Sequence, residues 1–156
     1  MKQAFCYETE LGKVVIAENG MAVTQLYFGE EISEGLTVNE TSLLKKAHQE
    51  LEEYLNGKRK SFDLPLSPEG TVFQQKVWKA LQSIPYGEVC CYKDIAIAIG
   101  NGNASRAVGG ANHNNPIAIF IPCHRVIGSS GALVGYAGGV DLKEKLLELE
   151  KNYNFK

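Results

Sequence analysis

The sequence lacks any long hydrophobic run. No stretch in its 156 residues approaches the roughly 18 apolar residues of a membrane-spanning helix. Glu8 and Glu10 follow closely behind Met1 and Lys2, so the N-terminus also lacks the apolar core of a secretion signal. Hydrophobic residues make up 44% and charged residues 22%, which is ordinary for a folded globular protein. We therefore expect a globular protein that stays inside the cell and has no membrane partner.

Cysteine is also scarce, with four residues at positions 6, 90, 91 and 123. The adjacent pair Cys90-Cys91 is a poor disulfide framework, and an intracellular compartment keeps thiols reduced. No two cysteines or histidines have the spacing of a zinc chelate. The sequence therefore predicts free thiols and no bound metal.

The formal net charge of −2 hides a difference between the two halves of the chain. Residues 1–69 carry 7 Lys and Arg against 12 Asp and Glu, a balance of −5, whereas residues 70–156 carry 9 against 6, a balance of +3. Pro65 and Pro68 lie in a linker-like stretch just before this change. We place a domain boundary between residues 69 and 70. The basic second half favours a polyanionic partner, although a solvated surface has the same composition.

The first half reads as a small antiparallel sheet followed by one helix. Residues 4–7, 13–17 and 22–28 have strand-like composition, and Asn19-Gly20 is a strong hairpin turn. Residues 41–55 carry apolar side chains at helical spacing. Nothing else in this half indicates chemistry.

The second half begins with three predicted helices, and a glycine turn joins the second of them to the third. Residues 73–83 and 92–99 read as helices, the latter with Ala96 and Ile99 facing inward, and a turn at 100–102 leads into a helix of small residues over 103–111. This outline is typical of a helix-turn-helix, whose second helix enters a DNA groove. Paired helices in a simple bundle give the same outline, so the pattern leaves both readings open.

The remaining elements complete a mixed α+β pattern. Residues 117–121 form an apolar, strand-like run, residues 128–139 form a glycine-rich loop, and residues 141–151 form a helix that we expect Asp141 to cap. The loop can wrap closely around a ligand or can be a plain hairpin connection, and it lacks the spacing of a phosphate-binding loop.

A thiol and an imidazole stand side by side in the stretch Ile121-Pro122-Cys123-His124-Arg125-Val126. A neighbouring cation or imidazole lowers the cost of ionising a thiol, and the thiolate is the nucleophile. His124 and Arg125 supply both kinds of neighbour. A buried structural cysteine is the alternative that the local spacing leaves open.

Four motifs together carry a family resemblance. They are Arg106-Ala-Val-Gly-Gly-Ala-Asn112, Asn115-Pro116, Ile-Pro-Cys123-His-Arg-Val and Gly135-Tyr-Ala-Gly-Gly139. In this order and spacing the chain resembles the O6-alkylguanine-DNA alkyltransferases, the methylated-DNA–protein-cysteine methyltransferases. The resemblance implies a ribonuclease-H-like N-terminal structural domain over 1–69. It also implies a winged helix-turn-helix-like DNA-binding and alkyl-acceptor domain over 70–156.

The activity that this resemblance implies is direct reversal of DNA damage. Cys123 would take a methyl or other alkyl group from O6 of guanine, or less readily from O4 of thymine, and keep it. The thioether formed is too stable for water to cleave, so each molecule acts once and needs no cofactor. The implied partner is the minor groove of double-stranded DNA, bound by a monomer that is cytoplasmic in a prokaryote and nuclear in a eukaryote.

The resemblance also implies roles around the thiol. A relay from Glu150 through His124 and a water would accept the proton of Cys123, with Glu148 as an internal control on the same helix. Tyr92 would donate a proton to the departing guanine or contact the phosphate 3′ to the flipped base. Asn115 would fix the cysteine loop. Without the resemblance these residues read as surface, packing and turn residues.

A DNA-contacting set follows in the same way. The damaged nucleotide must leave the stack before a buried thiol can reach it, and Arg106 resembles the family's arginine finger, which fills the gap. The other implied DNA contacts are Tyr92, Lys93, Asn101, Ala104, Ser105, Gly109 and Ser129. Small side chains on the recognition helix permit close approach to the minor groove.

Two departures from the family pattern and two other functions stay open. Cys90-Cys91 replaces small or hydroxylated residues, and Ala118 replaces a proline of some relatives, which can alter pocket width. A lesion-binding module without transfer activity is one alternative, although the presence of Cys123 counts against it. A cysteine hydrolase is the other, although no oxyanion hole is evident.

Overall fold

The computed structural model describes residues 2–131, 136 and 138–154. The chain forms two compact units, one of Met1–Glu69 with Pro116–Phe120, and one of Gly70–Asn115 with Ile121–Lys156. The sequence-based division assigns residues 116–120 to the second domain, whereas they belong to the first compact unit. In the described part of the chain, no helix combines the length and apolar character that crossing a membrane requires.

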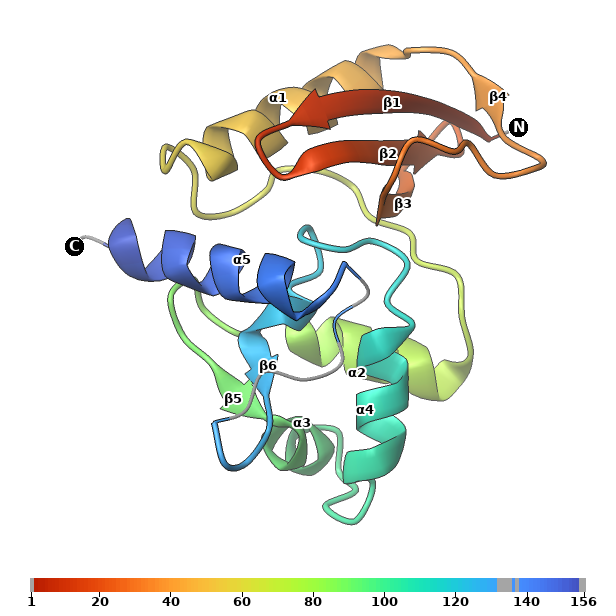
Figure 1. The fold of residues 1–156 in the computed structure, drawn as a ribbon. Helices are drawn as coiled ribbons and strands as arrows, with labels where there is room; N and C mark the ends of the chain where they lie inside the picture. Colours follow the sequence, from red (N-terminus) through yellow and green to blue (C-terminus); the bar gives the residue numbers. More distant parts are fainter. Residues whose placement is uncertain (1, 132–135, 137, 155–156) are drawn as a thin grey trace. The chain divides into compact units, whose positions relative to one another are not determined.

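The first unit is built on a four-stranded sheet with the order β3-β2-β1-β4 (Figure 1). Its strands are β1 (Gln3–Thr9), β2 (Gly12–Glu18), β3 (Val23–Phe28) and β4 (Thr37–Val38). The first three run antiparallel as predicted, and the short β4 pairs parallel to β1. Gly20 follows Asn19 in the turn between β2 and β3 with φ of 95°, a backbone conformation that glycine adopts without steric cost.

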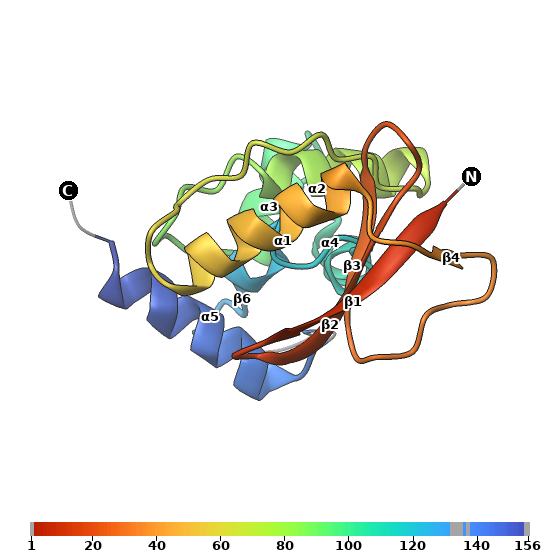
Figure 2. The same cartoon turned by 90° about the horizontal axis from the view of Figure 1, so that it is seen from above.

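Helix α1 (Ser42–Leu55) packs on β1, β2 and β3 (Figures 1 and 2). Thr41 caps it, because its hydroxyl accepts a hydrogen bond from the Leu44 amide at 3.2 Å. The helix buries a stripe of apolar side chains against the sheet, namely Leu44, Ala47, Leu51, Tyr54 and Leu55. Burying one leucine contributes roughly 1.5–3 kcal/mol, so this face anchors the first unit.

Residues 117–121 do not form the strand that their apolar run predicted. Leu26 donates to the Pro116 carbonyl at 2.9 Å and accepts from the Ala118 amide at 3.1 Å. An isolated bridge between Leu26 and Ile117 results in place of a strand, and Ile119 then has φ of 72°. Phe120 packs edge-on against Phe62, with ring centroids 4.7 Å apart. The run is apolar because it is buried, and its backbone turns after two bonded residues.

The second unit contains four α-helices and a two-stranded parallel sheet among its described residues (Figure 1). The helices are α2 (Val72–Leu81), α3 (Tyr92–Ala98), α4 (Ser105–His113) and α5 (Val140–Asn152), and the strands are β5 (Cys90–Cys91) and β6 (Val126–Ile127). Trp78 on α2 is buried and donates from its indole nitrogen to the Ala111 carbonyl of α4 at 2.8 Å. This bond fixes α4 on α2, next to the turn that follows α3.

Two expectations about helices in this unit are corrected. Ala96 is buried as predicted, but Ile95 is the other buried residue of α3, and Ile99 is only half-buried at its C-cap. Helix α5 begins at Val140 with Gly139 as its N-cap, so Asp141 lies in the first turn and does not cap the helix. Gly139 has φ of 96°, which a glycine accommodates and an aspartate at that position would not.

Candidate active site around Cys123

Cys123 opens a short 3₁₀ helix, η1 (Cys123–Arg125), and is only 3% exposed. Two buried amides hold the chain on either side of its thiol. Asn115 donates to the Ile121 carbonyl at 2.9 Å, and Asn112 donates to the Cys123 carbonyl at 3.3 Å. The backbone around Cys123 is therefore held by two side chains, one from α4 and one from the turn that follows α4. The role of Asn115 in fixing the cysteine loop stays a prediction, which its bond to the Ile121 carbonyl supports.

His124 and Glu150 lie in direct contact beside this thiol's loop. The His124 Nε2 is 2.7 Å from the Glu150 Oε2, and both side chains are fully buried. Glu148, two residues away on α5, is exposed. The structure thus brings together two of the three residues of the expected relay and leaves the control residue in solvent. Because Nε2 is on Glu150, a proton from Cys123 would have to reach the other ring nitrogen, Nδ1.

Arg125 is the main partner of Glu150 that sequence reasoning missed. Its Nε donates to Oε1 at 2.9 Å and its Nη2 donates to Oε2 at 2.9 Å, a two-pronged contact. Its Nη1 donates to the Ile84 carbonyl at 2.7 Å, and the Gly87 amide donates to the Glu150 Oε1 at 3.1 Å. The sequence suggested that Arg125 is a cation beside the thiol, whereas its guanidinium neutralises and orients the carboxylate behind His124.

Burial sets the direction of the pKa shift for Cys123 and His124, but not for Glu150. Desolvation raises the pKa of Cys123 to about 11, and the Asn115 hydrogen bond and the Lys143 charge offset only part of that rise. Burial likewise lowers the pKa of His124. Burial alone would raise the pKa of Glu150, but the hydrogen bonds and charges of His124 and Arg125 outweigh it and lower this pKa to about 2. In the unbound protein, burial therefore favours the protonated thiol of Cys123.

Lys143 is a second residue that the sequence reading missed. Its side chain is fully buried on α5, on the same helical face as Leu146 and Glu150. Burial lowers the pKa of Lys143, and its positive charge in turn favours the thiolate of Cys123. The spacing of positions 143, 146 and 150 marks one face of a helix and could have revealed this residue.

Tyr92 is the first residue of α3, and it lies close enough to Cys123 for a charge on that thiol to affect its pKa. Burial raises its pKa, a charge on Cys123 would raise it further, and a hydrogen bond from Asn112 opposes the rise. A side chain at Gly109 would meet the Tyr92 ring at 4.0 Å, so this glycine lies directly beside the ring. Tyr136 is also buried, and burial followed by the influence of Cys123 raises its pKa strongly.

The predicted DNA-contacting residues lie on α3, α4 and the loops of the same unit (Figure 1). Arg106 is exposed on the first turn of α4. Lys93, Asn101 and Ser129 are exposed as well, whereas Ala104, Ser105 and Gly109 are half-buried. Of the glycine-rich motif, Gly135 and Ala137 lie outside the described residues.

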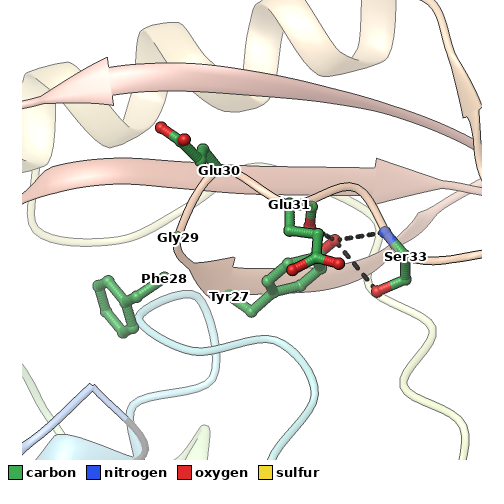
Figure 3. A pocket seen from close by; sticks show the side chains of 6 residues that line it. All are labelled: Tyr27, Phe28, Gly29, Glu30, Glu31 and Ser33. Carbon is green, nitrogen blue, oxygen red and sulfur yellow. Dashed lines mark hydrogen bonds between the residues drawn. The ribbon is translucent and has the colours of Figure 1, made fainter.

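A separate hollow lies in the first unit, at the end of β3 (Figure 3). Its volume is about 480 Å³, and it is lined by Tyr27, Phe28, Gly29, Glu30, Glu31 and Ser33. The Tyr27 hydroxyl donates to the Glu31 carbonyl at 2.8 Å and accepts from the Ser33 amide at 3.1 Å (Figure 3). No group of three or more His, Cys, Asp or Glu suited to a metal ion occurs within the described residues.

These features define a class: a helix-turn-helix protein with a buried cysteine beside a histidine–glutamate–arginine cluster. Family models agree with that class. Residues 5–68 match the ribonuclease-like domain, and residues 72–152 match the DNA-binding domain, of 6-O-methylguanine DNA methyltransferase. The chain belongs to the 6-O-methylguanine DNA methyltransferase family.

Individual relatives agree with this assignment. The methylated-DNA–protein-cysteine methyltransferase of Methanosarcina barkeri is 51% identical over 149 residues, covering 93% of this chain and 94% of the relative. The constitutive enzyme of that name from Bacillus subtilis is 49% identical, with 92% of each chain covered. The O6-methylguanine methyltransferase of Mycobacterium tuberculosis superposes with a TM-score of 0.91 at 44% identity, over 98% of this chain and 94% of that one. The protein of that organism solved in complex with DNA also gives a TM-score of 0.91, at 45% identity over 97% and 94% of the two chains.

Proposed function

We propose that this protein repairs alkylated DNA by moving the alkyl group from O6 of guanine, or less readily O4 of thymine, to the sulfur of Cys123. The observation that carries the proposal is a buried thiol inside a helix-turn-helix unit. In the same short helix, the His124 Nε2 lies 2.7 Å from the Glu150 Oε2. Sulfur suits this transfer because a thiolate is a strong nucleophile. The thioether product is stable, so each molecule reacts once and needs no cofactor.

The relay supplies the ionised sulfur only when it is needed. Since the pKa of Cys123 is about 11, the thiol holds its proton in the unbound protein. A water would carry this proton to Nδ1 of a neutral His124, while Glu150 stabilises the imidazolium that forms. The sulfur–carbon bond forms as the carbon–O6 bond breaks, with the electron pair remaining on the base. Tyr92 donates a proton to that base, which leaves as neutral guanine, and the proton held by His124 then returns through water to the Tyr92 phenolate.

The DNA interface in this proposal lies on α4 and the neighbouring turns. Arg106 fills the stack after the damaged nucleotide rotates out, a rearrangement that costs a few kcal/mol. The half-buried small residues Ala104, Ser105 and Gly109 permit α4 to approach the minor groove. Lys93, Asn101 and Ser129 would contact the backbone. The first unit serves a structural role, and the protein works as a monomer in the compartment that holds DNA: the cytoplasm of a prokaryote or the nucleus of a eukaryote.

Intact-mass measurement tests the proposed transfer directly. After incubation with a duplex carrying one O6-methylguanine, we expect the protein to gain one methyl group on Cys123 while the base is restored. Cys123→Ser removes the acceptor and should abolish the gain, whereas Cys6→Ser in the first unit should leave it intact. Lesion binding without a mass change would favour the module that binds without transfer. Repair that continues past one lesion per protein would favour a hydrolase.

A further inference from the structure

We propose that Arg125 is a positioning residue for alkyl transfer: its guanidinium fixes the Glu150 carboxylate against His124 and balances its charge, so that the imidazole is neutral when the thiol gives up its proton. Arg125 thereby sets the lower pH limit of the reaction. The inference rests on the proposed function, because it concerns the base of the relay. Sequence reasoning treated Arg125 only as a cation beside the thiol.

Glu150 is held through both of its carboxylate oxygens. Oε1 accepts from the Arg125 Nε at 2.9 Å and from the Gly87 amide at 3.1 Å. Oε2 accepts from the Arg125 Nη2 at 2.9 Å and lies 2.7 Å from the His124 Nε2. A planar guanidinium makes both of its contacts in one relative orientation, so the carboxylate cannot turn without breaking them. Arg125 therefore fixes the direction in which Glu150 meets the imidazole.

The guanidinium is itself held by the turn at residues 84–87, which follows α2. Its Nη1 donates to the Ile84 carbonyl at 2.7 Å, and its central carbon lies 5.7 Å from the centre of the Tyr86 ring, within the range of a cation–π contact. The same turn supplies the Gly87 amide to Glu150. Gly87 has φ of 81°, which glycine adopts without steric cost. One short turn therefore contacts both members of the ion pair through its backbone.

The pairing decides which nitrogen of His124 can take a proton. The pKa of Glu150 is about 2, so its carboxylate is ionised near neutral pH and can only accept hydrogen bonds. The neutral imidazole therefore carries its proton on Nε2, towards Glu150, and Nδ1 is the nitrogen that a further proton would occupy. Arg125 stays charged throughout and exchanges no proton. Its part in the relay is therefore to supply geometry and charge.

The charge of Arg125 opposes early protonation of His124. Burial lowers the pKa of His124, whereas the hydrogen bond and charge of Glu150 raise it. The charges of Arg125 and Lys143 lower this pKa further. Without Arg125, an unbalanced carboxylate would lie 2.7 Å from the imidazole and favour its protonated form. A protonated imidazole cannot accept the thiol proton, so the reaction would already fail at a higher pH.

The other groups around His124 do not take over this role. Helices α5 and α2 both pack on η1, and apart from Glu150 and Lys143 their charged residues are exposed. Burial raises the pKa of Tyr86 in the 84–87 turn and that of Cys123 in η1, so both are neutral near neutral pH. In the described part of the chain, the charge beside the imidazole is therefore set by Glu150, Arg125 and Lys143, and Arg125 contacts the carboxylate directly.

The pH dependence of transfer separates this role from a structural one. Benzyl transfer from free O6-benzylguanine to the full-length protein is timed by intact mass between about pH 5 and about pH 9, where a histidine base titrates. Arg125→Met removes the charge, Arg125→Lys keeps it without the two-pronged contact, and Glu150→Gln removes the carboxylate. Arg59→Met is the matched control, since Arg59 pairs with Glu53 at 2.8 Å and lies 3.5 Å from the buried Glu50 in the first unit. Urea unfolding checks that each variant is folded.

In Arg125→Met, the acid limb of the rate profile should move to higher pH by about one unit or more, because the carboxylate is no longer balanced. In Glu150→Gln the limb should move to lower pH. Arg125→Lys should keep the limb within about half a unit of the parent but lower the plateau rate about tenfold, since one ammonium cannot hold both oxygens. Arg59→Met should keep the parent profile. In ¹⁵N NMR of the histidine rings, the pKa of His124 should rise in Arg125→Met and fall in Glu150→Gln.

A uniform loss of rate in Arg125→Met, with the acid limb and the His124 titration unchanged, would overturn the inference and leave Arg125 a structural residue. Arg125→Lys that matches the parent at every pH would overturn it as well, and this variant decides the question if Arg125→Met does not fold. A parent protein that neither O6-benzylguanine nor an O6-methylguanine duplex modifies would instead refute the proposed function itself. A parent that reacts, with variant profiles that coincide with its own, refutes the role of Arg125 alone.

Discussion

Helices α1 and α5 bury residues at the same spacing, but they bury different chemistry. In α1 the positions are Leu44, Ala47 and Leu51, all apolar and fully buried. In α5 the corresponding positions are Lys143, Leu146 and Glu150, of which two carry charge. An amphipathic helix is stabilised by an apolar stripe, and each buried charge opposes that stabilisation unless it is paired. The first unit uses its helix for stability, whereas the second places ionisable groups beside a thiol.

Buried carboxylates sharpen the contrast. Glu50 in α1 accepts the Asp63 amide at 2.8 Å and lies 3.5 Å from the Arg59 guanidinium, which joins a helix to a following loop. Glu150 in α5 accepts from Arg125 and holds His124. Both are buried and paired, so burial alone does not identify a functional carboxylate. The distinguishing feature is a titratable partner next to a nucleophile.

The largest expected effect separates these two glutamates. Glu150→Gln weakens the support for a charged His124 and should slow alkyl transfer about a hundredfold, while Glu148→Gln should not. Glu50→Gln should leave transfer unchanged and destabilise folding by about 1–3 kcal/mol. Transfer is timed by intact mass, on samples whose folded fraction is known from urea unfolding. Equal rates for Glu150→Gln and Glu148→Gln would remove Glu150 from the relay.

The next effect contrasts exposed cations in the two units. Arg106→Ala should slow repair of a lesion in duplex DNA by about tenfold or more, since part of the flipping cost is no longer offset. Its reaction with free O6-benzylguanine should be unchanged. Lys45→Ala, an exposed cation of α1, is the matched control and should change neither. Parallel losses of Arg106→Ala on both substrates would contradict the finger role.

A smaller effect compares two corresponding buried positions, Leu44 in α1 and Lys143 in α5. Lys143→Met removes a charge that favours the thiolate, so transfer should slow about tenfold for each unit by which the pKa of Cys123 rises. The free energy of unfolding of Lys143→Met should stay the same or increase, because burying a charged ammonium group destabilises the fold. Leu44→Ala should destabilise by about 2–5 kcal/mol without slowing transfer by the folded protein. Urea unfolding and single-turnover rates measure both, and a loss of stability in Lys143→Met would count against this account.

The smallest expected effect is acid sensitivity of the second unit. The pKa of Glu150 is about 2 in the folded protein, below its ordinary 4.5, so its carboxylate stabilises folding above about pH 4.5. That contribution should fade as the pH drops from about 4.5 toward 2. Trp78, the single tryptophan, reports this unit by fluorescence. Glu150→Gln should flatten the acid dependence, and an unchanged slope would show that other groups cause it.

Local patterns predicted the first unit well. Thr41 and the helical spacing placed α1 to within one residue, and Asn19-Gly20 marked the β2–β3 turn. The error at residues 117–121 has a physical origin. A short, continuously apolar run is compatible with a strand, a helix or an irregular buried segment, and only its partners decide. Here Leu26 bonds two positions before Ile119 turns the chain away.

The sequence predicted the residues of the active site less completely than it predicted the elements of the first unit. Cys123 and His124 were singled out by their adjacency in the sequence, Glu150 came from the family resemblance, and the roles of all three stay predictions. Arg125 was misread because its function depends on reaching Glu150 and the Ile84 carbonyl, 41 residues earlier in the chain. The raised pKa of Cys123 was missed for a related reason, since neighbours in sequence suggest charge but only the folded packing sets desolvation.

The capture of residues 116–120 by the first unit bears on how the chain is made. The free side of β3 receives Pro116 and Ala118 only after these residues have left the ribosome, long after β1, β2 and α1 have emerged. Until then β3 offers unpaired backbone groups, a known route to aggregation. A fragment ending at Glu69 would leave the Leu26 backbone groups unpaired permanently, although residues 65–67 would still pair with Val23. The backbone pairing of β3 is therefore completed only after residues 70–115 of the second unit have been synthesised.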